Sequence, residues 1–157
     1  VARVADLDRG DADGTGDDSR LDLWRSLLPE RFNLYTSNDS RALSFTVAGG
    51  DGCFSNAANI VPRLFQSMQH SAAGGNLNAS RSIDDRLQPL FDALSRESEP
   101  ATVKHALSLV RHIGADVRLP LVDVTNETAE ALQAAVLPFQ FDGSGRFASR
   151  QTFRLGL

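Results

Sequence analysis

Two polar stretches of the sequence each follow a short apolar run, and they are the first candidates for chemistry. Residues 36–39 follow a run that ends at Tyr35, and residues 55–59 follow Phe54. The two runs predict short strands joined by a helix, which together form a βαβ unit. Loops that follow the strands of such units carry ligand-binding groups. We therefore expect these two loops to carry a site.

An acidic segment near the start of the sequence partly fits a calcium-binding loop. Its residues fall at positions one, three, five, six and twelve of the EF-hand pattern: Asp11, Asp13, Thr15, Gly16 and Asp22. The pattern ends in a Glu that binds through both oxygens, whereas this sequence has Asp22 there. Asp18 stands where the pattern has an apolar residue. We therefore interpret residues 8–18 as a solvated acidic loop.

Only one lysine, Lys104, is available to any chemistry that needs an amine nucleophile. It lies in a predicted helix, where an exposed ammonium would lack the lowered pKa that Schiff-base formation needs. His105 and His112 are seven residues apart on the same helix, and two histidines alone do not make a metal site. Cys53 lies in a predicted strand, so we expect a packed thiol and not a nucleophile.

The elements that hold these residues form a βαβα unit followed by three helices. The predicted helices cover residues 19–28, 43–48, 62–73, 77–94, 100–113 and 125–136, and a weak strand is predicted over 1–7. Residues 117–124 are predicted to be extended, and Pro120 excludes a central strand. There are too few strands for a closed parallel barrel. We expect a partial α/β unit with an uncovered strand edge and a helical C-terminal part.

Composition narrows the range of partners. The chain has 157 residues, 41% of them hydrophobic and 23% charged, with a formal net charge of −4, as in ordinary globular domains. The acidic balance argues against a nucleic-acid partner. No apolar run is long enough to span a bilayer, so we expect no membrane partner. A single cysteine excludes disulfides within the chain and favours a cytoplasmic setting.

Five segments together resemble the family of dihydrodipicolinate synthase and N-acetylneuraminate lyase: LYTSND, AGGDGCFSNAANIVPR, LQPLFDAL, EPATVKHAL and VRLPLV. The resemblance runs from residue 13 to residue 137. It implies a (β/α)8 TIM barrel with a C-terminal helical domain and class I aldolase chemistry, in which a lysine forms a Schiff base with pyruvate or another 2-oxo acid. By this resemblance, residues 1–73 are the last part of the barrel, 74–138 a three-helix domain and 139–157 an irregular tail.

Four residues match ligand-binding positions of that family. Ser37 matches a glycine beside the bound 2-oxo acid, and Asp39 matches an acidic residue that binds the sugar-acid substrate in the lyase branch. Phe54 matches an apolar residue whose backbone carbonyl faces the pyruvyl group. Asn56 matches a hydroxyl residue that the lyase branch uses. The substitutions at Ser37 and Asn56 leave the substrate open.

The position of the nucleophile is the main departure from the family. The family's lysine lies in a pattern of the form Gly-Ile-Lys-Asp-x-Thr-Gly-Asp, the end of which resembles Asp13, Thr15, Gly16 and Asp17. Ala12 then stands at the lysine position, and an alternative alignment on residues 1–6 places Ala5 there. The family's proton-shuttling tyrosine, and its threonine and arginine for carboxylates, belong to a part of the barrel that this sequence does not match.

Two functions follow and both stay open. The first is a piece of a class I aldolase or lyase, inactive alone for want of the nucleophile, whose ligand is a 2-oxo acid and which needs no cofactor or metal. The second is a non-enzymatic binding or assembly module that forms homo-oligomers through the barrel and the C-terminal helices. Residues before Asp13 and after Pro138 depart from the family pattern, which favours a truncated or frame-disturbed product.

Overall fold

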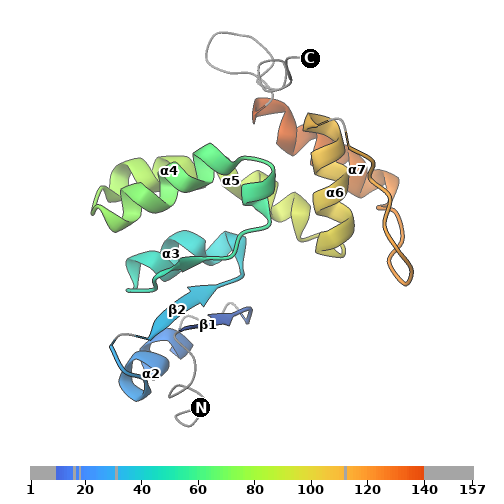
Figure 1. Ribbon diagram of the computed structural model, residues 1–157. Helices are drawn as coiled ribbons and strands as arrows, with labels where there is room; N and C mark the ends of the chain where they lie inside the picture. Colours follow the sequence, from blue (N-terminus) through green and yellow to red (C-terminus); the bar gives the residue numbers. More distant parts are fainter. Residues whose placement is uncertain (1–9, 16, 18, 31, 112, 140–157) are drawn as a thin grey trace, which may run out of the picture. The chain divides into compact units, whose positions relative to one another are not determined.

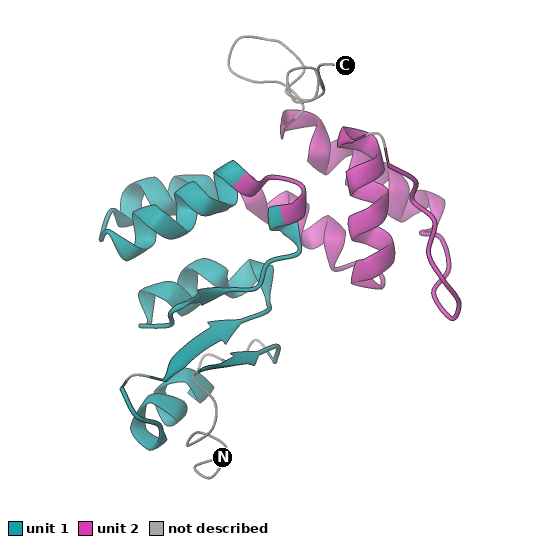
Figure 2. Ribbon diagram, viewed as in Figure 1, with its two compact units in different colours: residues 1–58, 63–86 teal, residues 59–62, 87–157 magenta. Residues whose placement is uncertain are grey.

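The computed structural model describes residues 10–15, 17, 19–30, 32–111 and 113–139. The chain divides into two compact units, residues 1–58 with 63–86 and residues 59–62 with 87–157 (Figure 1, Figure 2). Helix α5 (Leu77–Leu94) begins in the first unit and ends in the second. The predicted strand over residues 1–7 and the tail from residue 140 lie outside the described residues.

The first unit is built on a small parallel sheet. Among the described residues, the sheet has three strands that follow one another in chain order: β1 (Gly10–Asp13), β2 (Asn33–Thr36) and β3 (Gly52–Cys53). The segments between them are α2 (Ser19–Leu27), the 3-10 helix η1 (Asp39–Arg41) and α3 (Ala42–Val47). Both strand pairs are parallel, with Ala12 opposite Tyr35 and Tyr35 opposite Gly52. The predicted α/β class is therefore confirmed.

One face of this sheet is packed against α2 and α3. The buried cluster on that side consists of Leu21, Phe32, Leu34 and Phe45, with Trp24 and Leu28 packed against it. Leu34 is completely buried. Full burial of a leucine contributes about 1.5–3 kcal/mol. The apolar residues of α2 thus cover one face of the sheet. Ala12 is exposed on the other face.

Strand β1 corrects the prediction that residues 8–18 are a loop. Parallel strands are normally apolar, yet Asp13 is buried at the end of β1. The Thr15 hydroxyl donates to the Asp13 carboxylate at 2.8 Å, and Arg20 Nε lies 3.6 Å from its Oδ2. The backbone N–H of Ser37 donates to the Asp13 carbonyl at 2.9 Å. Pairing with β2 and these local partners outweigh the loop-like composition.

The carboxylate of Asp51, in the turn before β3, bonds to both α2 and the start of β2. Asp51 Oδ2 accepts hydrogen bonds from the Leu34 N–H at 2.7 Å and from Arg25 Nη2 at 2.6 Å. Arg25 also donates to the carbonyls of Phe32 and Gly49. Hydrogen bonds to charged groups typically contribute about 1.5–3 kcal/mol. The Arg25–Asp51 pair therefore bonds to the backbone at three places at one end of the sheet, namely Phe32, Leu34 and Gly49.

The remaining α-helices agree closely with the periodicity of the sequence. They are α4 (Pro62–Ala73), α5, α6 (Glu99–Val110) and α7 (Asn126–Val136). Thr125 caps α7 as predicted, because its side chain accepts from the Thr128 N–H. Helix α6 ends three residues before the predicted end, at residue 110 instead of 113. In the described part of the chain, no helix combines the length and apolar character needed to cross a membrane.

Within the second unit, α6 and α7 pack against each other. Ala106, Leu132 and Val136 are completely buried. Thr102 is also buried, and its hydroxyl donates to the Leu94 carbonyl at 2.8 Å, which ties the start of α6 to the end of α5. The predicted extended segment 117–124 contains neither helix nor strand.

Candidate functional site

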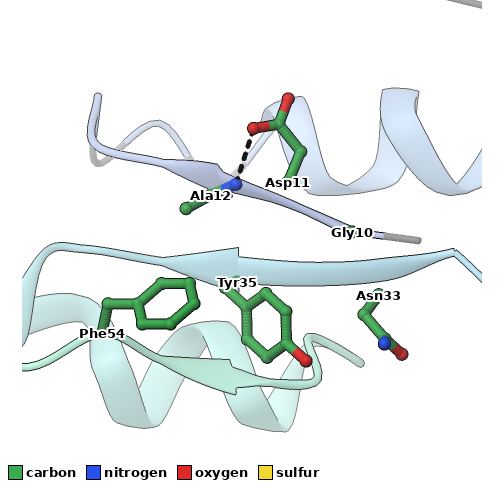
Figure 3. Close-up of a pocket in the computed structure, with 6 residues that line it drawn as sticks. All are labelled: Gly10, Asp11, Ala12, Asn33, Tyr35 and Phe54. Carbon is green, nitrogen blue, oxygen red and sulfur yellow. Dashed lines mark hydrogen bonds between the residues drawn. The ribbon is translucent and has the colours of Figure 1, made fainter. Parts of the chain in front are cut away.

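A hollow of about 390 Å³ opens on the exposed face of the sheet (Figure 3). The residues that line it come from β1, from β2 and from the position after β3: Gly10, Asp11, Ala12, Asn33, Tyr35 and Phe54. Side chains alternate between the two faces of a strand, so Tyr35 faces away from the buried Leu34. The volume is in the range of small-molecule sites, about 300–1,000 Å³.

The ring of Tyr35 fills the middle of this face. A Cβ at Gly10 would stand 3.2 Å from Tyr35 Cε2, and a Cβ at Gly52 would stand 3.4 Å from Tyr35 Cδ1. The glycine at position 10 therefore leaves space for the ring, whereas a Cβ at Gly52 would be in ordinary contact with it. The Phe54 ring lies beside it, with centroids 5.0 Å apart and planes tilted by 52° (Figure 3). Such pairs contribute about 0.5–1.5 kcal/mol.

No sequence-based prediction singled out Tyr35 or Asn33 as part of a site. The signal was the alternation along β2, where Asn33 and Tyr35 take one face and Leu34 and Thr36 the other. Thr36 and Leu34 are buried, whereas Asn33 is exposed. The alternation of a β-strand therefore predicts that Asn33 and Tyr35 share one face, the face that carries the hollow.

Ala12 lies on the same face, exposed and opposite Tyr35 in register (Figure 3). Its N–H donates to Asp11 Oδ1 at 2.8 Å. The methyl side chain offers neither a nucleophile nor a proton acceptor. The position that the resemblance assigns to a lysine thus borders the hollow without any reactive group.

The two predicted ligand loops meet at the carboxyl ends of β2 and β3. Asp39 Oδ2 accepts a hydrogen bond from the Ala57 N–H at 2.9 Å. Burial raises the pKa of Asp39, and this effect exceeds the opposing effects of the Ser55 hydroxyl and of the N–H groups of Ala57 and Asn56. The Oδ1 atom of Asp39 is buried and accepts no hydrogen bond of normal geometry from the described residues.

Ser37 lies at the end of β2, against the loop that follows β1. A Cβ at Gly14 would stand 2.9 Å from Ser37 Oγ, so a side chain there would require the serine hydroxyl to move. The preceding Thr36 hydroxyl donates to the Asp13 carbonyl at 3.1 Å and accepts from the Asn38 N–H. The structure thus joins Asp39 to the 55–57 loop, Phe54 to Tyr35, and Ser37 to Gly14.

Cys53 is the last residue of β3. Burial raises the pKa of its thiol to about 12, and the nearby negative charge of Asp39 adds to the rise. A thiol with that pKa stays protonated at neutral pH, so it is a poor nucleophile. This agrees with the prediction of a packed thiol.

Of the remaining candidates from the sequence, Asp11 is the one described residue that lines the hollow. Lys104 is in α6 of the second unit, where its Nζ donates to the carbonyl of Asp116. His112 and Gly16 are outside the described residues. Within the described ranges, no group of three or more His, Cys, Asp or Glu side chains could hold a metal ion. In the calcium-loop pattern, Asp13 is instead bound by Thr15 and Arg20.

Comparisons with known sequences point to one family. Residues 12–137 match the profile of the dihydrodipicolinate synthetase family. The chain is 39% identical over 138 residues to a 4-hydroxy-tetrahydrodipicolinate synthase of Gluconobacter oxydans, an alignment that covers 87% of this chain and 46% of the relative. It is 38% identical over 128 residues to the synthase of Rhizobium meliloti, covering 82% and 44%. The chain therefore spans about half the length of these relatives.

Solved structures give the same result. The dihydrodipicolinate synthase of Thermotoga maritima is similar with a TM-score of 0.82 and 32% identity over 87% of this chain and 48% of that one. The 4-hydroxy-tetrahydrodipicolinate synthase of Methylacidiphilum fumariolicum is similar with a TM-score of 0.83 and 26% identity, over 87% and 46%. The backbone of this chain thus follows about half of each of these enzymes.

Proposed function

Since this chain belongs to the dihydrodipicolinate synthetase family, we propose that β1, β2 and β3 are the last three strands of a (β/α)8 barrel. The parallel order of the three strands supports this assignment, as does the helix that follows each of the first two strands. Residues 74–138 then form the family's helical domain, which contains α5, α6 and α7.

We further propose that the carboxyl ends of β2 and β3, where Phe54 borders the hollow, form half of a binding site for a 2-oxo acid. Ligand sites of such barrels lie at the carboxyl ends of the strands. Ser37 and Asp39 follow β2, while Phe54 and Asn56 follow β3. The bond between Asp39 and the Ala57 N–H supports a shared site, because it brings the loops that follow two neighbouring strands together.

In this proposal the chain binds the 2-oxo acid but does not form a Schiff base with it. That reaction needs an unprotonated amine that attacks the ketone carbon, and the carbinolamine so formed then loses the former ketone oxygen as water. The observation that carries the proposal is Ala12, exposed on the open face and in register with Tyr35, at the position matched to the family's lysine. Lys104 belongs to α6 of the other unit.

The test is borohydride reduction of the purified chain in the presence of labelled pyruvate, followed by peptide mapping with mass spectrometry. We expect no reduced pyruvyl adduct on any lysine. The full-length Gluconobacter oxydans synthase, treated in parallel, shows that trapping works. A pyruvyl adduct on Lys104 would contradict the proposal, because the single lysine would then be a working nucleophile.

A second candidate function is a non-enzymatic assembly module. It is favoured by two large apolar side chains on the extended segment of the second unit, since Leu119 is 86% exposed and Val122 is 68% exposed. Exposed apolar groups of this kind mark contact surfaces when they form a patch. Light scattering would report a concentration-dependent oligomer that Leu119→Asp dissociates. A monomer at all concentrations would reject this candidate.

A further inference from the structure

The carboxylate of Asp39, after β2, is enclosed by the loop that follows β3. Its Oδ2 atom accepts the N–H of Ala57 at 2.9 Å, and Ala57 is completely buried. The Ser55 hydroxyl and the Asn56 N–H face the same carboxylate and stabilise its charge. The Oδ1 atom of Asp39 is buried as well. Successive groups of one loop thus surround a single side chain of the other loop.

The backbone that carries Asp39 is held at the carboxyl end of β2. The hydroxyl of the buried Thr36 donates to the Asp13 carbonyl at 3.1 Å and accepts the Asn38 N–H at 3.1 Å. Asn38 Oδ1 in turn accepts the Ser40 N–H at 3.1 Å, which caps η1 at its first residue, Asp39. The carboxylate of Asp39 therefore extends from a fixed support towards the loop after β3.

The loop after β3 needs such a partner because the strand that precedes it is short. Strand β3 has two residues, and its pairing with β2 ends at Cys53. One further backbone bond, from the Phe54 N–H to the Thr36 carbonyl at 2.8 Å, continues this pairing. Beyond Phe54 the chain leaves the sheet, yet the buried N–H of Ala57 still requires an acceptor. Asp39 supplies that acceptor.

We propose that Asp39 is a positioning residue, whose carboxylate fixes residues 55–57 for the 2-oxo acid and does not bind the ligand itself. The inference rests on the proposed function, in which the loops after β2 and β3 form half of the ligand site. The resemblance matches Asp39 to a residue that binds a sugar acid. A ligand hydroxyl would here have to displace the Ala57 N–H or reach the buried Oδ1. The geometry thus assigns this carboxylate to the protein's own backbone.

Hydrogen exchange of the full chain, followed by NMR, tests the loop without any ligand. Asp39→Ala removes the acceptor, so we expect the Ala57 amide to exchange at least about tenfold faster than in the unsubstituted chain. Asp39→Asn keeps an oxygen acceptor and should keep the protection. Asp51→Ala is the matched control, because it removes a carboxylate that accepts the Leu34 N–H at 2.7 Å, before β3 instead of after it. This control accounts for exchange by global unfolding, and Ala57 should exchange more slowly in it than in Asp39→Ala.

A pyruvate titration, also followed by NMR, tests the effect on the ligand site. Asp39→Ala should bind pyruvate at least about tenfold more weakly than the unsubstituted chain, because the loop that borders the ligand is released. Asp39→Asn and Asp51→Ala should both stay within about threefold of the unsubstituted chain. Circular dichroism verifies that each variant is folded.

The charge of Asp39 has a readout of its own that requires no alanine variant. Burial raises the pKa of Asp39, so the chemical shift of the Ala57 amide should change as this carboxyl titrates in the acidic range. The change should be much smaller in Asp39→Asn, which has no group to titrate there. The neighbouring Cys53 stays protonated over this range, since its pKa is about 12.

Equal exchange of Ala57 in Asp39→Ala and Asp51→Ala would overturn the inference, as would an Ala57 shift that does not respond to pH or an unchanged pyruvate affinity in Asp39→Ala. A loss of pyruvate affinity in Asp39→Asn with Ala57 still protected would also overturn it, because the charge would then act on the ligand. An unsubstituted chain that binds no pyruvate, but in which Ala57 responds as expected, would refute the proposed 2-oxo acid site and confirm that Asp39 positions the loop.

Discussion

Cys53 permits a direct test of how the end of β3 is packed, because it is the only cysteine of the chain. Burial and the nearby Asp39 raise the pKa of its thiol from 9.0 to about 12. Only the thiolate reacts with alkylating reagents. Each unit of pKa changes the thiolate fraction tenfold below both values, so the folded chain should react about a thousandfold more slowly than an unfolded one.

The assay is a time course of iodoacetamide modification at about pH 8, followed by intact-mass spectrometry. The same chain in concentrated urea gives the reference rate of an exposed thiol. The Asp39→Asn variant removes the negative charge that is the smaller cause of the raised pKa. It should react faster than the unsubstituted chain but still far more slowly than the unfolded one, since burial remains.

A folded chain that reacts within about tenfold of the unfolded rate would refute the packing described at β3. An Asp39→Asn variant that reacts no faster would refute the electrostatic contribution of Asp39. The raised pKa also has a consequence for folding. Below about pH 9 the thiol is protonated in both the folded and the unfolded chain, so the free energy of unfolding is at its full value with respect to this group. As the pH rises from about 9 through about 12, the unfolded chain releases the thiol proton first, and the free energy of unfolding falls.

Three further predictions concern stability. Asp51→Ala should lower the free energy of unfolding by about 1–3 kcal/mol, because the Leu34 N–H and Arg25 lose a shared acceptor, whereas Asp51→Asn should cost less in the same urea titration. Gly10→Val should cost about 1–3 kcal/mol, because even its Cβ would stand 3.0 Å from the Asn33 carbonyl; unchanged stability would refute the close approach of β1 and β2. Asp39→Asn should be at least as stable as the unsubstituted chain near neutral pH, because a raised pKa means that the fold disfavours the charged carboxylate, and this advantage should shrink as the pH falls towards about 4.

The helices of this protein are determined largely by local sequence. Helix α4 begins at Pro62 and ends at Ala73, before Gly74 and Gly75, as the sequence predicts. Its apolar residues recur at helical spacing, and Phe65 and Met68 are buried as that spacing indicates. Periodicity and helix-breaking residues act within a few positions of the chain, so the sequence by itself is sufficient here.

The loops at the strand ends were also predictable as neighbours. Parallel strands bring their carboxyl ends to the same edge of a sheet, and the hydrogen bond between Asp39 and the Ala57 N–H follows from that geometry. The two apolar runs that precede these loops are sufficient to predict that both loops follow strands.

Strand β1 and the place of Tyr35 were decided by the tertiary structure. The composition of residues 8–18 favours a loop, but Gly10–Asp13 gains a parallel partner in β2, and Asp13 gains Thr15 and Arg20. The ring of Tyr35 has its space beside β1 because Gly10 carries no Cβ there. The residues that pair between strands are separated in the sequence by 17 positions or more, and no local pattern encodes which strands pair. Strand pairing is a property of the whole chain, and it alone placed Ala12, Tyr35 and Phe54 around one hollow.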